Sequence, residues 1–290
     1  MDGATAPADG VVRPHLRGLP VFKMTGSGND FVMLDGRNST PADWSAADIQ
    51  AVCARATGIG ADGIVFVSPG DAAGSARMTY FNSDGSHAAM CGNAALCSTR
   101  LAARLGMAPA TGMRLETDAG VYDSRCDMPD ERAELHLGAV APPAAVAGLG
   151  VLDGGGERRA ALLTVGVPHL VVLVDDVDHV DLPVRGAALR FDPALGPPGA
   201  NVNFVSSGKS ASEWRMRTYE RGVEAETLAC GTGSVAAACA LESWGLGQLP
   251  AVILTRMGLE LGVRGTKLSD GRYDVWLAGE ARLVFRGVIA

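Results

Sequence analysis

Two short stretches decide the fold, Cys91-Gly-Asn-Ala-Ala95 and Cys230-Gly-Thr-Gly-Ser234. In each, a cysteine followed by glycine opens a run of small and apolar residues. This pattern predicts one helix over about 92–105 and another over about 231–244, each followed by the glycine that commonly ends a helix. Helices with so few bulky or charged side chains are expected to be wrapped closely by other elements on most of their surface.

The chain before each predicted helix follows one plan. A short turn between two strand-like segments carries Asn29 near its end, 62 positions before Cys91. A matching turn ends at His169, 61 positions before Cys230. Because the two spacings agree within one residue, we interpret the chain as a duplication with low identity between its halves.

Strand-like segments outnumber helices in both halves. The sequence predicts a helix over 45–56, strands over 19–24, 31–34, 64–68, 77–82, 113–118, 134–137, 161–165, 170–174, 201–205 and 213–219, and four strand-like pieces within 252–288. The expected fold class is α+β, with two pseudo-symmetric domains, each a curved and mostly antiparallel sheet or barrel around a central helix. Residues 145–158 are expected to be a flexible connection near the middle.

The composition is that of a globular protein. Apolar residues make up 47% and charged residues 20% of the 290 positions, which excludes a disordered chain. The formal net charge of −7 argues against nucleic acid as a partner, since a nucleic-acid-binding protein needs a basic patch. The longest apolar stretches, such as 170–174, are far shorter than the roughly 20 residues of a membrane span, so no membrane partner is expected.

Residues 1–18 are rich in Ala, Gly and Pro and are expected to form a flexible tail. They lack the basic start and apolar middle of a signal peptide, so the expected location is the cytoplasm, where thiols stay reduced. The six cysteines include no Cys-x-x-Cys pair, and the histidines show no metal spacing. We therefore expect no metal site. No lysine stands in an obvious setting for pyridoxal phosphate, and we expect no cofactor.

The positions of Cys91 and Cys230 suggest chemistry at the helix starts. A helix N-terminus presents unpaired N–H groups and a partial positive charge, which lower the pKa of a thiol and bind carboxylates. If the two halves face each other, both helix starts converge on one substrate carboxylate, with a sulfur on each side of its α-carbon. A thiolate and a thiol would then form the matched base and acid that inversion of a stereocentre by proton exchange requires.

Other interpretations stay open at this point. Free cysteines are commonly buried and inert, which is the interpretation we favour for Cys53, Cys97, Cys126 and Cys239. As a disulfide couple, Cys91 and Cys230 would serve a thiol redox protein, which transfers electrons to a partner without exchanging substrate hydrogen. A non-catalytic amino-acid-binding protein would bind its ligand without turnover.

Six segments, in order along the chain, resemble the diaminopimelate epimerase family. They are Phe22-Lys-Met-Thr-Gly-Ser-Gly-Asn-Asp-Phe31, Gly58-Ile-Gly-Ala-Asp62, Phe81-Asn-Ser-Asp-Gly-Ser86, Met90-Cys-Gly-Asn93, Tyr219-Glu-Arg-Gly222 and Glu226-Thr-Leu-Ala-Cys-Gly-Thr-Gly233. The resemblance implies two pseudo-symmetric domains with the substrate between them and a last strand that returns to the first domain. The expected boundaries are 19–136 plus 280–290 for the N-terminal half and 137–279 for the C-terminal half.

The resemblance also implies an activity. This is the cofactor-independent conversion of LL-diaminopimelate to meso-diaminopimelate, in lysine and cell-wall precursor biosynthesis, with Cys91 and Cys230 as the acid/base pair. The small-molecule amino-acid substrate would be held by the side chains of Asn29, Asn82, Asn201, Glu220 and Arg221. Its reacting carboxylate would meet the backbone amides of Gly92, Asn93, Gly231 and Thr232. A homodimer is expected by resemblance only.

Four positions depart from the family's usual pattern. Ala94 and Leu96 stand where the family usually has Gly and Arg, Val167 where it often has Asn, and Gly63 where some members have Gln. These changes bear on local packing and on the expected hold on the α-amino group or the distal end of the substrate. Both Cys-Gly pairs are intact, so the activity class survives. The alternative is a racemase or epimerase of another amino acid, independent of pyridoxal phosphate, on the same fold.

Two further patterns receive structural interpretations. Residues 58–63 match Gly-x-Gly-x-x-Gly, but a predicted helix precedes them and a strand follows, which is the reverse of a dinucleotide site. His169 is the only histidine on a motif turn, and a structural hydrogen bond is its expected role.

Overall fold

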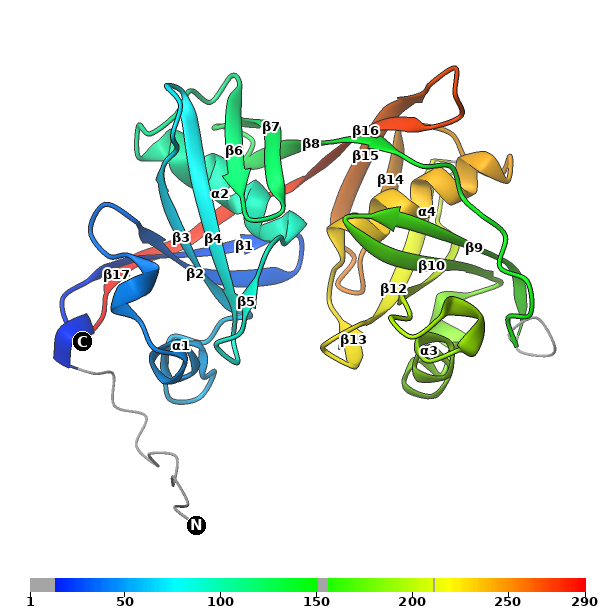
Figure 1. The fold of residues 1–290 in the computed structure, drawn as a ribbon, viewed down its shortest axis with the longest axis horizontal. Coiled ribbons are helices and arrows are strands. Elements are labelled where there is room, and N and C mark those ends of the chain that lie inside the picture. Colours follow the sequence, from blue (N-terminus) through cyan, green and yellow to red (C-terminus); the bar gives the residue numbers. More distant parts are fainter. Residues whose placement is uncertain (1–13, 151–155, 211) are drawn as a thin grey trace, which may run out of the picture.

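The computed structural model describes residues 14–150, 156–210 and 212–290. Figure 1 shows two halves side by side, the first on the left and the second on the right. Among the described residues, 17 strands form one continuous hydrogen-bonded sheet, and four α-helices accompany them. The predicted α+β fold class is confirmed.

The first half begins with a hairpin and ends at a strand that runs toward the second half. Its elements are β1 (Pro20–Gly26), β2 (Asn29–Asp35), α1 (Ala46–Cys53), β3 (Gly63–Pro69), β4 (Ser75–Asn82), β5 (His87–Ala88), α2 (Gly92–Arg104), β6 (Met113–Thr117), β7 (Gly120–Asp127) and β8 (Arg132–Val140). The sequence patterns did not predict the short β5 or the mostly exposed β7.

The second half has the same succession of elements. They are β9 (Glu157–Val165), β10 (Val167–Val174), α3 (Leu182–Arg190), β11 (Asn201–Ser207), β12 (Glu213–Glu220), β13 (Ala225–Thr227), α4 (Gly231–Ser243), β14 (Ala251–Leu254), β15 (Glu260–Lys267) and β16 (Tyr273–Glu280). The last strand, β17 (Arg282–Val288), has no counterpart in the first half.

Strand pairing shows that the two halves are copies of one topology. In the first half β1 pairs with β2, β2 runs parallel to β3, β3 pairs with β4, and β4 runs parallel to β6, which is followed by β7 and β8. The second half repeats every one of these pairings from β9 to β16, including the two parallel ones. The predicted duplication is confirmed.

Two connections join the halves. β8 pairs with β16 in antiparallel fashion, so the last strand of one copy lies beside the last strand of the other. β17 then crosses back and pairs with β1, from Pro20 opposite Val288 to Thr25 opposite Arg282 (Figure 1). The boundary expected at 136/137 falls inside β8 and stays a prediction.

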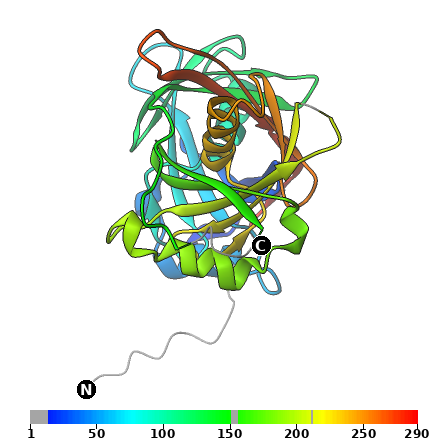
Figure 2. The same ribbon diagram turned by 90° about the vertical axis from the view of Figure 1, so that its right-hand side faces the viewer.

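Each copy is built around its apolar helix. In α2 every residue from Gly92 to Ala102 is buried, and in α4 every residue from Gly231 to Leu241 is buried except Thr232. Figure 2 shows α4 in the middle of the surrounding strands. The many alanines let strands approach closely, and the predicted wrapping of both helices is confirmed. None of the helices in the described ranges has the length and hydrophobicity needed to cross a membrane.

The flexible tail predicted over residues 1–18 is wrong at its C-terminal end. Pro14–Leu16 forms a 3-10 helix, η1, and the Leu16 side chain is fully buried. The Gly18 N–H donates to the Ile289 carbonyl at 2.7 Å, which ties this segment to the end of the chain. A single leucine among Gly, Pro and charged residues has no periodicity, so its burial could not be predicted from its neighbours. Residues 1–13 of the predicted tail lie outside the described residues.

The flexible connection predicted over 145–158 is wrong at its C-terminal end. β9 begins at Glu157, whose buried carboxylate accepts two hydrogen bonds from Arg185 Nη2, at 2.9 and 2.8 Å. This ion pair fixes the start of the strand against α3. Residues 151–155 of the predicted connection lie outside the described residues.

The helices outside the core differ from expectation. α3 was not predicted, because Pro183 and Gly186 interrupt its helical pattern. Gly186 is required there, since a Cβ at this position would lie 2.6 Å from the Cβ of Tyr219. α1 is shorter than the predicted 45–56. Ser45 caps its start, and the helix stops where Ala54 turns to an extended backbone.

Candidate active site

The N-termini of α2 and α4 meet between the two halves. A Cβ atom placed on Gly92 would lie 3.7 Å from the Cα of Gly231 and 3.9 Å from the backbone nitrogen of Thr232. The side chain of Leu277, on β16, lies beneath both starts. Its Cδ2 would be 3.2 Å from a Cβ on Gly92 and 2.8 Å from one on Gly231. The two helix starts therefore converge, and glycine at both positions permits the close approach.

Cys91 and Cys230 are the N-cap residues of these helices. Both have extended backbone angles, with φ of −142° and −136°, as is usual at an N-cap. Cys230 is buried and Cys91 is half-buried. The causes that raise the pKa of Cys230 are burial, then the carboxylate of Glu220, and last the charge of Cys91. The two sulfurs from opposite halves thus share one electrostatic environment.

Both thiols are harder to ionise than a free cysteine. Burial raises the pKa of Cys91 to about 11 and that of Cys230 to about 12. The backbone N–H groups of Ala94 and Gly233 act in the opposite direction, one at each helix start. The predicted lowering of the thiol pKa is therefore wrong. The loss of water around each sulfur outweighs the favourable N–H groups.

On the side of the first half, Asn29 is held by a carboxylate. Its Nδ2 donates to Asp62 Oδ2 at 2.9 Å, and its Oδ1 accepts from Asn93 Nδ2 at 2.7 Å. Asp62 also accepts from Arg55 Nη2 at 2.6 Å. Because a carboxylate only accepts, Asp62 fixes the orientation of the Asn29 amide. Asn93 Oδ1 is buried with no partner in the described part of the chain, and a Cβ on Gly231 would lie 3.4 Å from it.

On the side of the second half, a chain of polar contacts ends at a catalytic candidate. Asn203 Nδ2 lies 3.3 Å from His169 Nδ1. His169 Nε2 lies 3.0 Å from Thr232 Oγ1, and Thr232 Oγ1 lies 3.8 Å from Cys230 Sγ. His169 is fully buried. Burial, followed by the charge of Arg221, lowers the pKa of His169 to about 3, so the ring is neutral.

The direction of these hydrogen bonds follows from their partners. Asn203 Nδ2 also faces two backbone carbonyl oxygens, at 3.3 and 3.5 Å, so it is the amide NH₂ group. It donates to Nδ1 of His169, whose own proton must then lie on Nε2 and be donated to Thr232. The hydroxyl hydrogen of Thr232 is left to point at Cys230 Sγ. The structural hydrogen bond predicted for His169 is confirmed, and it leads to the sulfur.

Asn201 and Arg221 are linked across neighbouring strands. Asn201 stands opposite His169 in the β10–β11 ladder. Its Oδ1 accepts from the backbone N–H of Arg221 at 2.7 Å. The charge of Arg221 contributes to the low pKa of His169, which places the guanidinium near the second helix start.

Glu220 is the last residue of β12, and its charge acts on both cysteines. Burial raises the pKa of Glu220, and the charge of Asp62 adds to this. The Glu220 charge in turn raises the pKa of both Cys91 and Cys230. Contributions from both halves meet at this carboxylate.

The structure gives the remaining predicted positions different surroundings. Asn82 ends β4 opposite Gly63, and its Nδ2 donates to Ser86 Oγ at 3.0 Å. Ala94 and Leu96 are fully buried in the core around α2, where an Arg would have no water. Val167 begins β10 opposite Val165 in a tight hairpin. No contact in the described part of the chain links Val167 to either cysteine.

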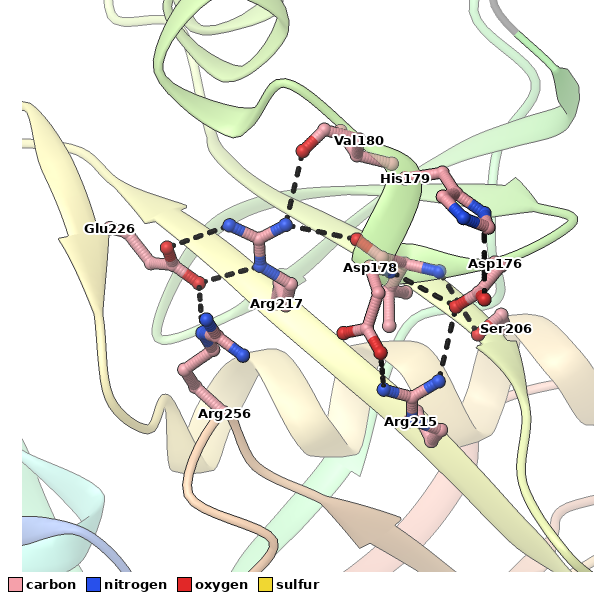
Figure 3. Close-up of polar contacts among 10 residues, drawn as sticks. Asp176, Asp178, His179, Val180, Ser206, Arg215, Arg217, Glu226 and Arg256 are labelled. Atoms are coloured by element: carbon pink, nitrogen blue, oxygen red, sulfur yellow. Dashed lines mark hydrogen bonds and ion pairs between the residues drawn. The ribbon is translucent and has the colours of Figure 1, made fainter.

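Figure 3 shows how the β12–β13 hairpin, which precedes Cys230, is anchored. Arg217 on β12 donates to Glu226 on β13 at 2.7 and 2.8 Å. The same guanidinium donates to the carbonyls of Val177 and Val180, both at 3.0 Å. Arg256 approaches the Glu226 carboxylate at 3.5 Å. These contacts tie the strand that leads to Cys230 to the 3-10 helix η3 (Val177–His179).

Sequence reasoning missed three residues of this site. Asp62 lies inside one of the segments that carried the resemblance, but its link to Asn29 crosses 33 positions. Asn203 is two positions after Asn201, although only the fold shows that it reaches His169. Tyr80 lies on the same strand as Asn82, and a Cβ placed on Gly63 would lie 3.0 Å from its hydroxyl oxygen. No motif in the sequence pointed to this tyrosine.

In the ranges that the structure describes, no three His, Cys, Asp or Glu side chains are grouped to hold a metal ion. Lys23 is buried in the first half, where its ammonium group is paired with Asp30 at 2.5 Å and with the carbonyl of Gly60.

Comparison with known proteins shows similarity over most of the chain. The family model described as Diaminopimelate epimerase matches residues 21–141 and 161–259. The diaminopimelate epimerase of Gemmatimonas aurantiaca is 47% identical over 281 residues, covering 94% of this chain and 99% of that protein. The one from Aquifex aeolicus is 38% identical over 280 residues, covering 93% and 97%.

Solved structures of low identity share the fold. A crystal structure of the Bacillus anthracis phenazine biosynthesis protein of the PhzF family superposes with a TM-score of 0.71 at 15% identity, covering 94% of this chain and 99% of that one. A hydroxyproline epimerase from Agrobacterium vitis, with bound trans-4-OH-L-proline, gives 0.61 at 18% identity, covering 94% and 93%. The duplicated topology, the family model and the relatives agree, and the chain belongs to the diaminopimelate epimerase family.

Proposed function

We propose that the chain converts LL-diaminopimelate to meso-diaminopimelate without a cofactor, using Cys91 and Cys230 as the two acid/base groups. The observation that carries this proposal is the meeting of two cysteine-headed helix starts from opposite halves, so close that a Cβ on Gly92 or Gly231 would contact the Cα of the other. Incubation of the reduced protein with LL-diaminopimelate, followed by chiral separation, tests it. Appearance of the meso form is the expected result, and recovery of LL-diaminopimelate alone would contradict it.

In this reaction one sulfur takes up a proton and the other releases one. One thiolate removes the α-hydrogen and becomes a thiol, which leaves a carbanion at the α-carbon. The thiol on the opposite face donates its proton to that carbon and becomes a thiolate. Backbone N–H groups of Gly92, Asn93, Gly231 and Thr232 would hold the reacting carboxylate and stabilise the negative charge as it develops. After this step the thiolate lies on the opposite face, which suits the conversion of meso to LL, and exchange of protons with solvent restores the form that acts on LL-diaminopimelate.

The high pKa values of the two thiols suit this mechanism. A buried thiol stays protonated, and therefore protected, until a ligand arrives. The substrate brings an ammonium group next to the reacting carbon. A positive charge within about 4–6 Å favours the thiolate form, so substrate binding itself would lower the pKa of the base.

We assign the two ends of the substrate to different sets of residues. Asn29, Asn82, Asn201, Glu220 and Arg221 would hold its polar groups, with the Arg221 guanidinium on the distal carboxylate and Glu220 on an ammonium group. The orientation that Asp62 gives to Asn29 would select configuration, since an unmatched buried polar group costs about 1–3 kcal/mol. If exchange appeared only with another amino acid, the alternative substrate would be indicated on the same fold.

The affinity for substrate is expected to weaken in mild acid because of Glu220. Burial raises the pKa of Glu220, so this carboxylate takes up a proton at higher pH than an ordinary glutamate. Below that pKa the protonated group no longer attracts an ammonium group, and KM rises as pH falls. In Glu220→Gln we expect KM at neutral pH to be about tenfold higher than in the wild-type protein. The rise of KM in mild acid that the Glu220 carboxylate causes should be missing from this variant. KM profiles of both proteins between about pH 5 and 8 measure this. Parallel profiles would contradict it.

The hydroxyl of Thr232 is expected to favour the thiolate of Cys230. In Thr232→Val the side chain keeps its size and loses the donor that His169 orients. Alkylation of Cys230 by iodoacetamide, relative to Cys91 in the same sample, should fall about tenfold, because a hydrogen bond to a charged group is lost. Peptide mass spectrometry gives this ratio.

Two matched variants control this measurement. Thr232→Ser should retain the wild-type ratio, because it keeps the hydroxyl. Thr99→Val makes the same change on α2, at a buried hydroxyl bonded to the Ala95 carbonyl at 2.9 Å. It should leave the ratio unchanged. An unaltered ratio in Thr232→Val would mean that the hydroxyl does not act on the sulfur.

We further infer a cytoplasmic homodimer. Reactive thiols without a disulfide partner suit a reducing compartment. In the described part of the chain, β17 pairs only with β1, and it exposes Val284, Phe285 and Val288. An exposed apolar edge strand is a surface that a second copy would cover. Sedimentation should give twice the chain mass of 29.8 kDa, and a mass of one chain would exclude the dimer.

A further inference from the structure

Tyr80 shares a strand face with Asn82. In the β3–β4 ladder, Tyr80 stands opposite Val65 and Asn82 stands opposite Gly63. Side chains two apart on a strand point to the same side, so both project from one face of β4. Tyr80 belongs to the core cluster around α2, whereas its neighbour Phe81 packs on the other face, in the cluster near α1.

The Tyr80 ring fills the space beside Gly63. A Cβ placed on Gly63 would lie 2.5 Å from Tyr80 Cε2, 3.0 Å from its Oη and 2.3 Å from the Phe81 carbonyl oxygen. No side chain fits at position 63, and the phenol stands where one would project. Phe31 packs edge-on against the ring, with centroids 5.9 Å apart at 85°, which restricts its rotation. The glycine at position 63, which departs from the family's pattern, therefore makes room for the Tyr80 ring.

The Tyr80 hydroxyl is surrounded by groups of the candidate site. Burial raises the pKa of Tyr80 far above its usual range, and the charges of Cys91, Asp62 and Glu220 raise it further. The phenol thus remains protonated, and the carboxylates of Asp62 and Glu220 are among the groups that act on it. The residue is only 6% exposed, and in the ranges described its hydroxyl makes no hydrogen bond. The fully buried polar atoms that lack a partner in these ranges do not include the Tyr80 oxygen, so this oxygen is accessible and can bond to a ligand.

We propose that Tyr80 is a specificity-determining residue whose hydroxyl oxygen accepts a hydrogen bond from an ammonium group of the substrate. This inference rests on the proposed function, because it takes the ligand to be an amino acid. An ammonium group supplies three donors and the positive charge that the carboxylates of Asp62 and Glu220 favour. The rigid, nearly buried ring holds the acceptor in place with little loss of side-chain freedom on binding.

Tyr80→Phe tests the proposal with a change of one atom. We expect KM for LL-diaminopimelate to rise about tenfold, since a hydrogen bond to a charged group is lost, while kcat changes far less. Tyr122→Phe is the matched control, because Tyr122 lies on β7 in the first half and is half-buried. It should leave both constants unchanged. An unchanged KM in Tyr80→Phe, or a fall in kcat alone, would overturn the proposal.

A second measurement needs no variant of Tyr80. With ¹³Cζ-tyrosine in the Cys91→Ala protein, which should bind without turnover, LL-diaminopimelate is expected to shift the Tyr80 resonance. Pimelate, which has the two carboxylates and no ammonium group, is expected to leave it unshifted. Equal shifts with both would overturn the proposal. Wild-type protein with no epimerase activity toward diaminopimelate would instead overturn the proposed function, so the two failures are distinguishable.

Discussion

Replacing either Cys91 or Cys230 by alanine is expected to lower the rate of epimerisation by at least about 10³-fold, within the range that one acid/base group contributes. Both sulfurs take part in each direction of the reaction, one as base and the other as acid. Removal of either one should therefore stop the conversion of LL to meso and of meso to LL alike. Chiral separation of the two forms in both directions measures this.

The matched controls are two cysteines on the same helices. Cys97 on α2 and Cys239 on α4 are fully buried, and burial raises the pKa of both well above that of free cysteine. Cys97→Ala and Cys239→Ala should keep kcat within about threefold of wild type, since neither thiol reaches the helix start and a small cavity costs mainly stability. Loss of activity in these controls, or its survival in Cys91→Ala, would contradict the assignment of the two bases.

Gly231→Ala is expected to reduce kcat/KM by about 100-fold, because a displacement of roughly 1 Å in a reacting group has an effect of that size. Its Cβ would lie 2.8 Å from Leu277 Cδ2, so either the Leu277 side chain or the start of α4 must shift, while Asn93 Oδ1 at 3.4 Å and Gly92 Cα at 3.7 Å leave little room on the other side. Alanine is a better helix former than glycine by up to about 1 kcal/mol, so a loss of folding stability is not the expected cause. Steady-state kinetics and thermal unfolding separate the two explanations.

The loss of kcat/KM in each glycine variant should be larger where the added Cβ lies closer to neighbouring atoms. Gly92→Ala meets the same Leu277 atom at 3.2 Å and should be milder. Gly112→Ala meets no atom within 4 Å and should be neutral. If Gly231→Ala and Gly112→Ala had equal activity, close approach of the helix starts would not be required for the reaction.

The features that could be predicted from the sequence are those that produce a residue pattern within a short segment of the chain. The small-sided helices after Cys91 and Cys230 and the matched spacing of the preceding turns were sufficient to predict two similar halves around central helices. The strand pairing confirms that plan through its repeated parallel and antiparallel order. α3 escaped prediction because Pro183 and Gly186 break its pattern, and only the packing of Tyr219 explains the glycine.

The electrostatics of the site could not be predicted from position alone. A cysteine at a helix start is expected to ionise easily, but here burial outweighs the N–H groups and raises both thiol pKa values. The helix start is visible in the sequence, whereas the depth of burial is a property of the whole fold. The contacts of Asp62 with Asn29 and of Asn203 with His169 likewise span 33 and 34 positions.

The most direct test of two sulfurs acting on one carbon is the early distribution of deuterium. Reduced protein is incubated with LL-diaminopimelate in D₂O and stopped when only a small part has reacted. With two bases, the newly formed meso product carries deuterium at the inverted carbon, while the remaining LL substrate still carries hydrogen. Equal labelling of substrate and product at that stage, or a meso product free of deuterium, would contradict the account.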